Sequence, residues 1–237
     1  MARLVRLDTL RGRCQARASF QGFSNTYPDA EWNDMINEGI AGVYDIIREA
    51  FGQGYYRRSV KINTTSTTSI YALPGDFLAL ISVDATLGGG YPNITMRPYM
   101  EPERNRYKNF PWLWFSGYPV WYQLQAQDFS GSGVSSQTPA INFIPDPQGN
   151  YVVTCYYVPV PPVLVADGDT FDGVNGWDEW VVCDVACKAL TKDGDLDVIA
   201  AIREQQSRTE ARIRGLAPQR DFQGERVADV VPFDWEP

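Results

Sequence analysis

The sequence predicts an α+β protein with a four-helix bundle formed by N- and C-terminal helical pairs, an inserted antiparallel β-sandwich or barrel-like subdomain, and an extended C-terminal tail. Three observations support this fold class. The apolar residues follow a helical period before residue 55, an alternating period from 55 to 162, and a helical period again afterwards. Aromatic residues make up 13% of the chain, and 16 prolines with 20 glycines imply many turns, as in a β-rich region. Because the sheet region starts and ends beside helices, the two helical pairs can close one bundle.

The domain boundaries follow from these changes of period. We expect an N-terminal helical pair over residues 1–54, a β-rich subdomain over 55–162, a C-terminal helical pair over 163–215, and an extended tail over 216–237. The chain has 237 residues, of which 44% are hydrophobic and 21% charged, so it is long enough and apolar enough to bury a core.

The first helix is predicted over residues 4–17. Leu4, Leu7 and Leu10 recur every three residues, and Cys14 follows after four. Arginines are interleaved with these apolar positions. They form either a solvated basic face or a face that meets an acidic partner or DNA, and they are Arg3, Arg6, Arg11, Arg13 and Arg17.

The second helix is the clearest element of the sequence. The segment Thr26-Tyr-Pro-Asp29 resembles a helix start, and Gly52 with Gly54 ends the helix. Gly39 and Gly42 lie in its middle, where glycine costs up to about 1 kcal/mol relative to alanine, so we expect another helix to approach closely there. One continuous apolar stripe runs along the helix through Trp32, Met35, Ile36, Ile40, Val43, Tyr44 and Ile47.

The β-rich subdomain shows the alternation typical of strands. Strands are predicted over residues 59–63, 70–74, 77–86, 120–126, 140–144 and 150–158, with a short helix within 98–109 and an exposed loop over 129–137. Both faces of the last strand are apolar, which favours a sandwich or barrel in which both faces are covered.

Two further helices are predicted over residues 176–192 and 196–214, and Gly215 with Pro218 is expected to end the second. The residues after 215 have no helical period. They form a tail whose apolar side chains are candidates for docking, namely Phe222, Val227, Val230, Val231, Phe233 and Trp235.

The residues that usually carry chemistry are missing or poorly placed. The chain has no histidine, which excludes Ser-His and Cys-His nucleophile pairs, and its four cysteines match no zinc spacing. Asp193, Asp195 and Asp197 have calcium-loop spacing, but Val198 occupies the position where such a loop needs glycine. We therefore expect no catalytic residue, no cofactor and no metal ion, and we expect the cysteines to be small buried apolar side chains.

A second acidic group, Asp167, Asp169 and Asp172, is compatible with a carboxylate-based hydrolase, although a solvated turn before the third helix is the simpler interpretation. The net charge is −8, which disfavours a protein that coats DNA. No apolar run is long enough to span a bilayer, and the basic N-terminus lacks the apolar core of a signal peptide. We expect a protein of a reducing cytoplasm that does not bind membranes.

The aromatic residues between 110 and 122 allow two interpretations. They either stack on sugars or pack in a core or between subunits, where aromatic side chains dominate the energetics. The residues expected to pack between subunits are Trp112, Trp114, Trp121, Trp177 and Trp180.

The order of the predicted elements resembles that of the phage head-to-tail adaptor family, also described as head-completion or connector proteins. The first features that carry the resemblance are a short leading helix and the long helix that follows it. Three further features are Ile70-Tyr71-Ala-Leu73-Pro74-Gly-Asp76-Phe77 before the inserted sheet, the helical start Trp177-Asp-Glu-Trp180-Val-Val, and the extended tail. In the long helix the resemblance lies in Trp32-Asn-Asp-Met-Ile-Asn37-Glu-Gly-Ile.

The resemblance implies a structural virion protein rather than an enzyme. It implies a ring, typically of twelve copies, that joins the portal to tail or neck proteins at the neck of the virion after assembly in the host cytoplasm. DNA would pass through the ring without sequence-specific binding. The tail would add to a portal surface as a strand. The alternative is another tail or baseplate subunit that contacts glycans or tail fibres through the aromatic residues 110–122, and a carboxylate-based enzyme is a third hypothesis.

Overall fold

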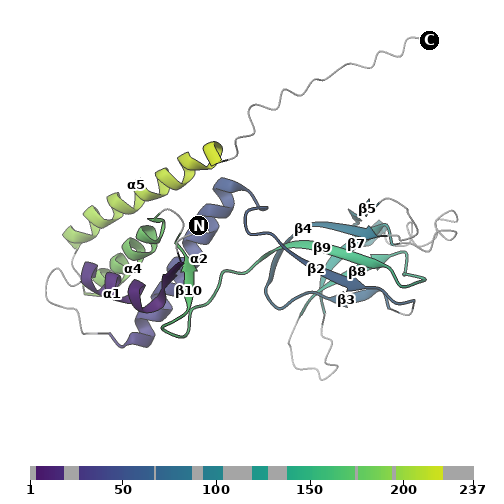
Figure 1. The fold of residues 1–237 in the computed structure, drawn as a ribbon, viewed down its shortest axis with the longest axis horizontal. Helices are drawn as coiled ribbons and strands as arrows, with labels where there is room; N and C mark the ends of the chain where they lie inside the picture. The colour runs from purple at the N-terminus through teal and green to yellow at the C-terminus, as the bar shows by residue number, and fades with distance from the viewer. Residues whose placement is uncertain are drawn as a thin grey trace, which may run out of the picture. The chain divides into compact units, whose positions relative to one another are not determined.

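The computed structural model describes residues 4–18, 27–66, 68–86, 93–103, 119–127, 138–173, 176–193 and 196–220 (Figure 1). The fold is α+β, and the chain divides into two compact units. The helical unit comprises Met1–Gly52 and Pro162–Pro237, and the β unit comprises Gln53–Pro161.

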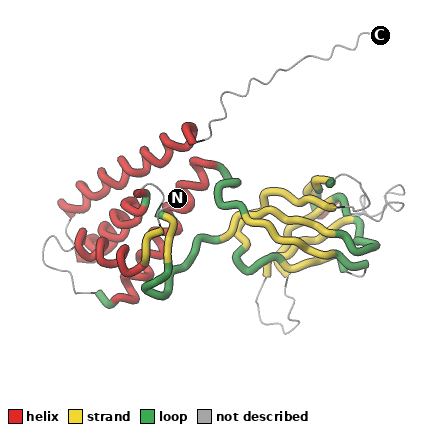
Figure 2. Tube along the Cα trace, viewed as in Figure 1, coloured by secondary structure: helices red, strands yellow, loops and turns green. Residues whose placement is uncertain are grey.

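The helical unit contains every long helix of the described residues (Figure 2). These are α1 (Leu7–Ala18), α2 (Asp29–Phe51), α4 (Asp178–Asp193) and α5 (Leu196–Arg220). Helix α4 packs against α1, α2 and α5, while α2 also contacts α1 and α5. A short antiparallel ladder joins β1 (Leu4–Arg6) to β10 (Thr170–Asp172). The first and last parts of the chain therefore meet in one unit.

The apolar stripe of α2 is buried, which confirms the helix predicted there. Apolar positions three and four residues apart lie on one face of a helix, and this face packs into the unit. Helix α4 is buried on several sides, because it lies among three other helices. Along α2 the buried side chains include Trp32, Ile36, Ile40, Val43 and Ile47.

The first predicted helix begins later than expected. Residues Leu4–Arg6 form β1, in which Leu4 pairs with Asp172 and Val5 pairs with Phe171. Leu4 is consequently 65% exposed, while Val5 is buried. The pairing of β1 with β10 outweighs the helical spacing of Leu4, so the first helix begins only at Leu7.

Two helix ends also differ from expectation. Pro28 occupies the N-cap position of α2, with no side-chain hydrogen bond to the helix. Helix α5 continues past Gly215 to Arg220, so the helix end predicted at Gly215 and Pro218 is wrong. Ile213 is buried, and Arg214 pairs with Glu49 and Glu210 at 3.0 Å.

The β unit consists of two four-stranded sheets. One has the order β2-β9-β4-β5 and the other β3-β8-β7-β6. All ladders in these sheets are antiparallel except β6–β7, and neither sheet closes into a barrel among the described residues. The barrel-like alternative is therefore wrong for this part of the chain. The strands are β2 (Arg58–Asn63), β3 (Ile70–Ala72), β4 (Phe77–Thr86), β5 (Ile94–Thr95), β6 (Arg97–Pro98), β7 (Trp121–Gln127), β8 (Thr138–Ile144) and β9 (Val152–Pro159).

The two sheets share one apolar core. Their alternating residues point to a common cluster, which includes Val83 of β4, Phe143 of β8 and Cys155 of β9. Each of these three side chains is fully buried. All six strands predicted from alternation are present. The short helix predicted within 98–109 corresponds to the 3-10 turn η2 (Glu101–Glu103). Residues 104–109 lie outside the described part of the chain.

Candidate interaction surfaces

The arginines of α1 contact acidic and polar side chains of the helical unit itself. Arg11 donates hydrogen bonds to Asp167 at 2.6 Å, Asp29 at 3.2 Å and Asn33 at 3.0 Å. Arg6 pairs with its neighbour Asp8 at 2.8 Å, and Arg3 lies outside the described residues. Arg11 is therefore engaged inside the unit and does not form a solvated face or a face for DNA.

Asp178 at the start of α4 forms the buried centre of this network. Its side chain is 2% exposed and accepts a hydrogen bond from Arg13. Glu179 beside it accepts from Arg13 at 2.9 Å and from Arg17 at 2.6 Å. Burial alone lowers the pKa of Arg13, but its bonds to Asp178 and Glu179 outweigh this and raise the pKa above its ordinary value. The guanidinium groups thus fasten α1 to α4.

The glycines of α2 lie where α4 packs, which confirms the predicted close approach. A Cβ atom on Gly42 would lie 2.8 Å from Cη2 of Trp180, and one on Gly39 would lie 3.0 Å from Cγ1 of Val181. A side chain on Gly42 would force Trp180 to move, and one on Gly39 would make a tighter contact than Cβ atoms ordinarily make. The flat indole of Trp180 thus packs directly against the backbone of α2 at Gly42.

The tryptophans expected to pack between subunits fall into two groups. Trp112 and Trp114 lie outside the described residues, while Trp121 begins β7 and is half-buried beside its ladder partner Ile144. Trp177 and Trp180 are 1% and 9% exposed, so their indoles pack inside the helical unit and leave little area for a neighbour. An inter-subunit role for these tryptophans stays a prediction.

The apolar side chains of the C-terminal tail all lie outside the described residues. They are Phe222, Val227, Val230, Val231, Phe233 and Trp235. The docking role predicted for them therefore stays a prediction.

The acidic residues before α4 have structural partners. One oxygen of Asp169 accepts the backbone N–H groups of Val165 and Ala166, both at 2.8 Å, and these bonds hold the pKa of Asp169 below its ordinary value. Asp167 pairs with Arg11. These two carboxylates hold a loop in place, which gives no support to a hydrolase site. The calcium-loop interpretation is incompatible with α5, which runs as a helix through Val198.

The cysteines are free and buried, which confirms their predicted role as small apolar side chains. Burial raises the pKa of Cys14 and of Cys155 to about 12, and that of Cys183 to about 11. Neutral thiols are poor nucleophiles and poor metal ligands. Among the described residues, no three His, Cys, Asp or Glu side chains are placed to hold a metal ion.

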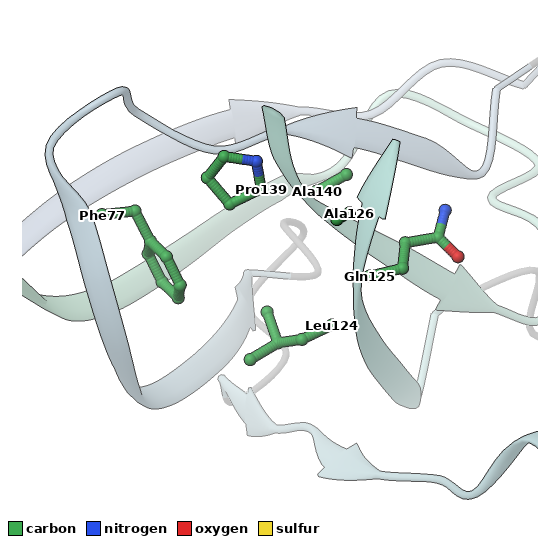
Figure 3. A pocket seen from close by; sticks show the side chains of 6 residues that line it. All are labelled: Phe77, Leu124, Gln125, Ala126, Pro139 and Ala140. Carbon is green, nitrogen blue, oxygen red and sulfur yellow. The ribbon is translucent and has the colours of Figure 1, made fainter. Parts of the chain in front are cut away.

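The β unit has an apolar hollow of about 420 Å³ on its surface (Figure 3). Leu124, which is 43% exposed, and Phe77 contribute its largest apolar side chains. The lining contains no titratable group, so the hollow suits an apolar side chain of a partner better than a reaction. It is lined by Phe77, Leu124, Gln125, Ala126, Pro139 and Ala140.

The charge of the chain is divided unequally between the two units. The helical unit contains 23 acidic and 14 basic residues and has a net charge of −9, whereas the β unit contains 6 acidic and 7 basic residues and has a net charge of +1. The overall charge of −8 is thus a property of the helical unit. The two units consequently present very different surfaces to a charged partner.

No helix in the described part of the chain is both long enough and apolar enough to cross a lipid bilayer.

A family model described as SU10 adaptor protein matches residues 5–230 of the chain. No curated protein matches the chain.

Proposed function

Because the chain belongs to the SU10 adaptor protein family, we propose that it forms a ring of twelve copies that joins the phage portal to the tail or neck and completes the DNA channel. The chain is a structural adaptor protein of a bacteriophage virion. The match over residues 5–230 carries the proposal, because it includes both units and the start of the tail.

A ring subunit must be stiff, and the helical unit has two features that suit this requirement. The ion pairs of Asp178 and Glu179 with α1 fix one helix, and the contact of Trp180 with Gly42 fixes another. We assign the four helices to a bundle that acts as a rigid wedge. The two sheets of the β unit, which share one apolar core, are assigned to a sandwich.

The charge distribution supports a conduit for DNA. Without the tail residues 221–237, whose net charge is −4, each helical unit has a net charge of −5, and this charge repeated around a ring repels the phosphate backbone, so a duplex passes without adhering. The basic residues that could interrupt this repulsion in α1 are neutralised by their own acidic partners, as for Arg11 and Arg13. We therefore place the helical units, rather than the β units, along the channel.

Contacts with other virion proteins are assigned to the tail and to the tryptophans. The apolar tail residues from Phe222 to Trp235 dock on the portal, where an added strand gains affinity from backbone hydrogen bonds. Between subunits we expect Trp121, which is half-buried, to pack against the neighbouring copy. Tail or neck proteins then bind the opposite surface of the ring.

Mixing the protein with its portal tests the proposal. Electron microscopy should show a ring of this chain on the portal ring. Docking should be lost in a variant with Phe233→Ser and Trp235→Ser, and should persist in the matched variant Gln223→Ser. A chain that stays monomeric beside the portal, together with infectious particles that lack the chain, contradicts the proposal.

A further inference from the structure

The longest exposed sheet edge of the β unit is strand β2. Among the strands that end the two four-stranded sheets, β2 has six residues, whereas β3, β5 and β6 have two or three. An edge strand presents unpaired N–H and C=O groups that another strand can bind. In the described part of the chain, β2 has a ladder partner on one side only, which is β9.

The register identifies which backbone groups of β2 face outward. The N–H of Thr64 donates to the carbonyl oxygen of Tyr151 at 2.9 Å, which extends the ladder in which Ile62 pairs with Val153. In an antiparallel ladder, residues bind the partner strand at every second position. Arg58, Val60 and Ile62 therefore bind β9. The backbone N–H and C=O groups that point away from β9 belong to Ser59, Lys61 and Asn63. All three residues are exposed.

This edge is basic. Lys61 has no ion-pair partner among the described residues, and Arg57 lies over the ring of Tyr156 at 4.9 Å. Arg58 pairs with Asp76 at 2.7 Å and remains 64% exposed. Cations on an edge disfavour pairing with an identical edge, because like charges would face each other. They favour an acidic strand.

The chain itself contains a segment with the matching properties. Residues 221–237 have five acidic residues and one arginine, a net charge of −4. Residues 231–236 read Val-Pro-Phe-Asp-Trp-Glu, so apolar and polar or proline residues alternate as they do in a half-buried strand. A fully extended stretch of this length reaches roughly 55–60 Å beyond Arg220, which is enough to leave the subunit.

We propose that the C-terminal segment of one copy, residues 227–236, adds as a strand to the β2 edge of a second copy. The inference rests on the proposed function, which brings copies side by side and treats this segment as a docking strand. The β2 edge of a neighbouring copy would be a second binding site for that segment, besides the portal. Before the portal is met, the apolar side chains of the segment are held on a neighbouring subunit, and the portal competes for them.

The backbone test uses the full-length protein in sedimentation equilibrium without portal. Ser59→Pro removes one outward N–H group and leaves the ladder to β9 intact, which an edge strand tolerates. Self-association should weaken about tenfold or more, since a main-chain bond and the strand geometry are lost. Ser59→Ala, which retains the N–H group, should associate like the parent. Equal association of Ser59→Pro and Ser59→Ala overturns the proposal.

A charge test covers the case in which Ser59→Pro fails to fold. Lys61→Glu should weaken self-association, and a chain that also contains Asp229→Lys and Asp234→Lys should recover it. Weakening by Lys61→Glu that the reversed tail does not restore contradicts the proposal. In hydrogen exchange, the amides of Ser59, Lys61 and Asn63 should gain protection as the protein concentration rises, and unchanged exchange of these amides overturns it.

A mixing experiment distinguishes exchange between copies from docking within one chain. A variant with Ser59→Pro and a variant with Phe233→Ser and Trp235→Ser should each self-associate about tenfold or more weakly than the parent. Their mixture should form heterodimers, because one copy retains an intact edge and the other an intact tail. No association in the mixture overturns the proposal. Association without portal, combined with failure to bind the portal, would contradict the proposed function and leave this inference standing.

Discussion

The indole of Trp180 in α4 lies against Gly42 of α2, so closely that Cη2 would be 2.8 Å from a Cβ atom on that glycine. The contact joins helices from opposite ends of the sequence. Helix α4 also receives the ion pairs from α1, so it is the element around which the helical unit is organised.

Substitution of Gly42 by alanine should destabilise the protein. The added methyl group collides with the ring of Trp180, and such overpacking costs about 1–3 kcal/mol, more than the gain in helix propensity. Gly12→Ala is the matched control, because nothing lies within 4 Å of its Cβ position, and it should stabilise α1 by about 0.5–1 kcal/mol. Urea unfolding of both variants measures the difference, and a neutral Gly42→Ala would contradict the packing.

Removal of the Arg13 charge should be costly. Arg13→Met leaves the carboxylate of Asp178 buried without its cation, and breaking a pair of this kind costs about 3–5 kcal/mol when both groups are buried, less here because Arg13 is partly exposed. Arg6→Met removes an exposed pair with Asp8 and should cost only about 0–1 kcal/mol. Thermal unfolding should separate the two variants clearly.

Asn37 should be important for the return of the chain to the helical unit. Its side chain accepts a hydrogen bond from the N–H of Leu164 at 2.8 Å and donates one to the carbonyl of the same residue at 3.0 Å. Asn37→Ala leaves both buried backbone groups without this partner, at a cost of about 1–3 kcal/mol. Glu38→Ala, which removes an exposed pair with Lys188, should cost about 0–1 kcal/mol and serves as the control in denaturant unfolding.

The buried thiols predict a loss of stability at alkaline pH. The pKa of Cys14 is raised from 9.0 to about 12 by burial, so between these pH values the unfolded thiol is ionised while the folded thiol retains its proton. The folded state then binds more protons than the unfolded state, and its stability falls as pH rises through this window. Urea unfolding at pH 8 and pH 10.5 should show the decrease. Alkylation of Cys14 should be slow until urea is added, and rapid alkylation of the native protein would contradict its burial.

The elements with long periodic patterns could be predicted from sequence, and the short ones could not. The apolar stripe of α2 and the alternation of β9 extend over many residues, so their type and approximate ends were correct. The strands β1 and β10 have three residues each, too few to show a period, and they exist because each pairs with the other. The close approach at Gly39 and Gly42 was predicted because glycine is unfavourable in a helix without such a reason.

The candidate surfaces were harder to predict. Sequence alone shows that α1 is rich in arginine, but it does not show that Asp167 and Asp178 lie opposite Arg11 and Arg13, since these partners come from the other end of the chain. Similarly, Trp177 and Trp180 were expected to pack between subunits, although the structure buries them within the helical unit. An apolar side chain is expected to be buried, but the sequence does not show whether it is buried within one subunit or between two subunits.

The discontinuity of the helical unit has a consequence during synthesis on the ribosome. Helices α1 and α2 emerge first, but α4, which covers them, follows only after the whole β unit has been translated. At roughly 5–20 residues per second, the 127 residues from Phe51 to Asp178 take roughly 6–25 seconds. Throughout this interval, the stripe of α2 around Ile36 and Ile40 lacks the cover of α4 and α5, and this transiently exposed apolar surface makes the nascent chain prone to aggregation.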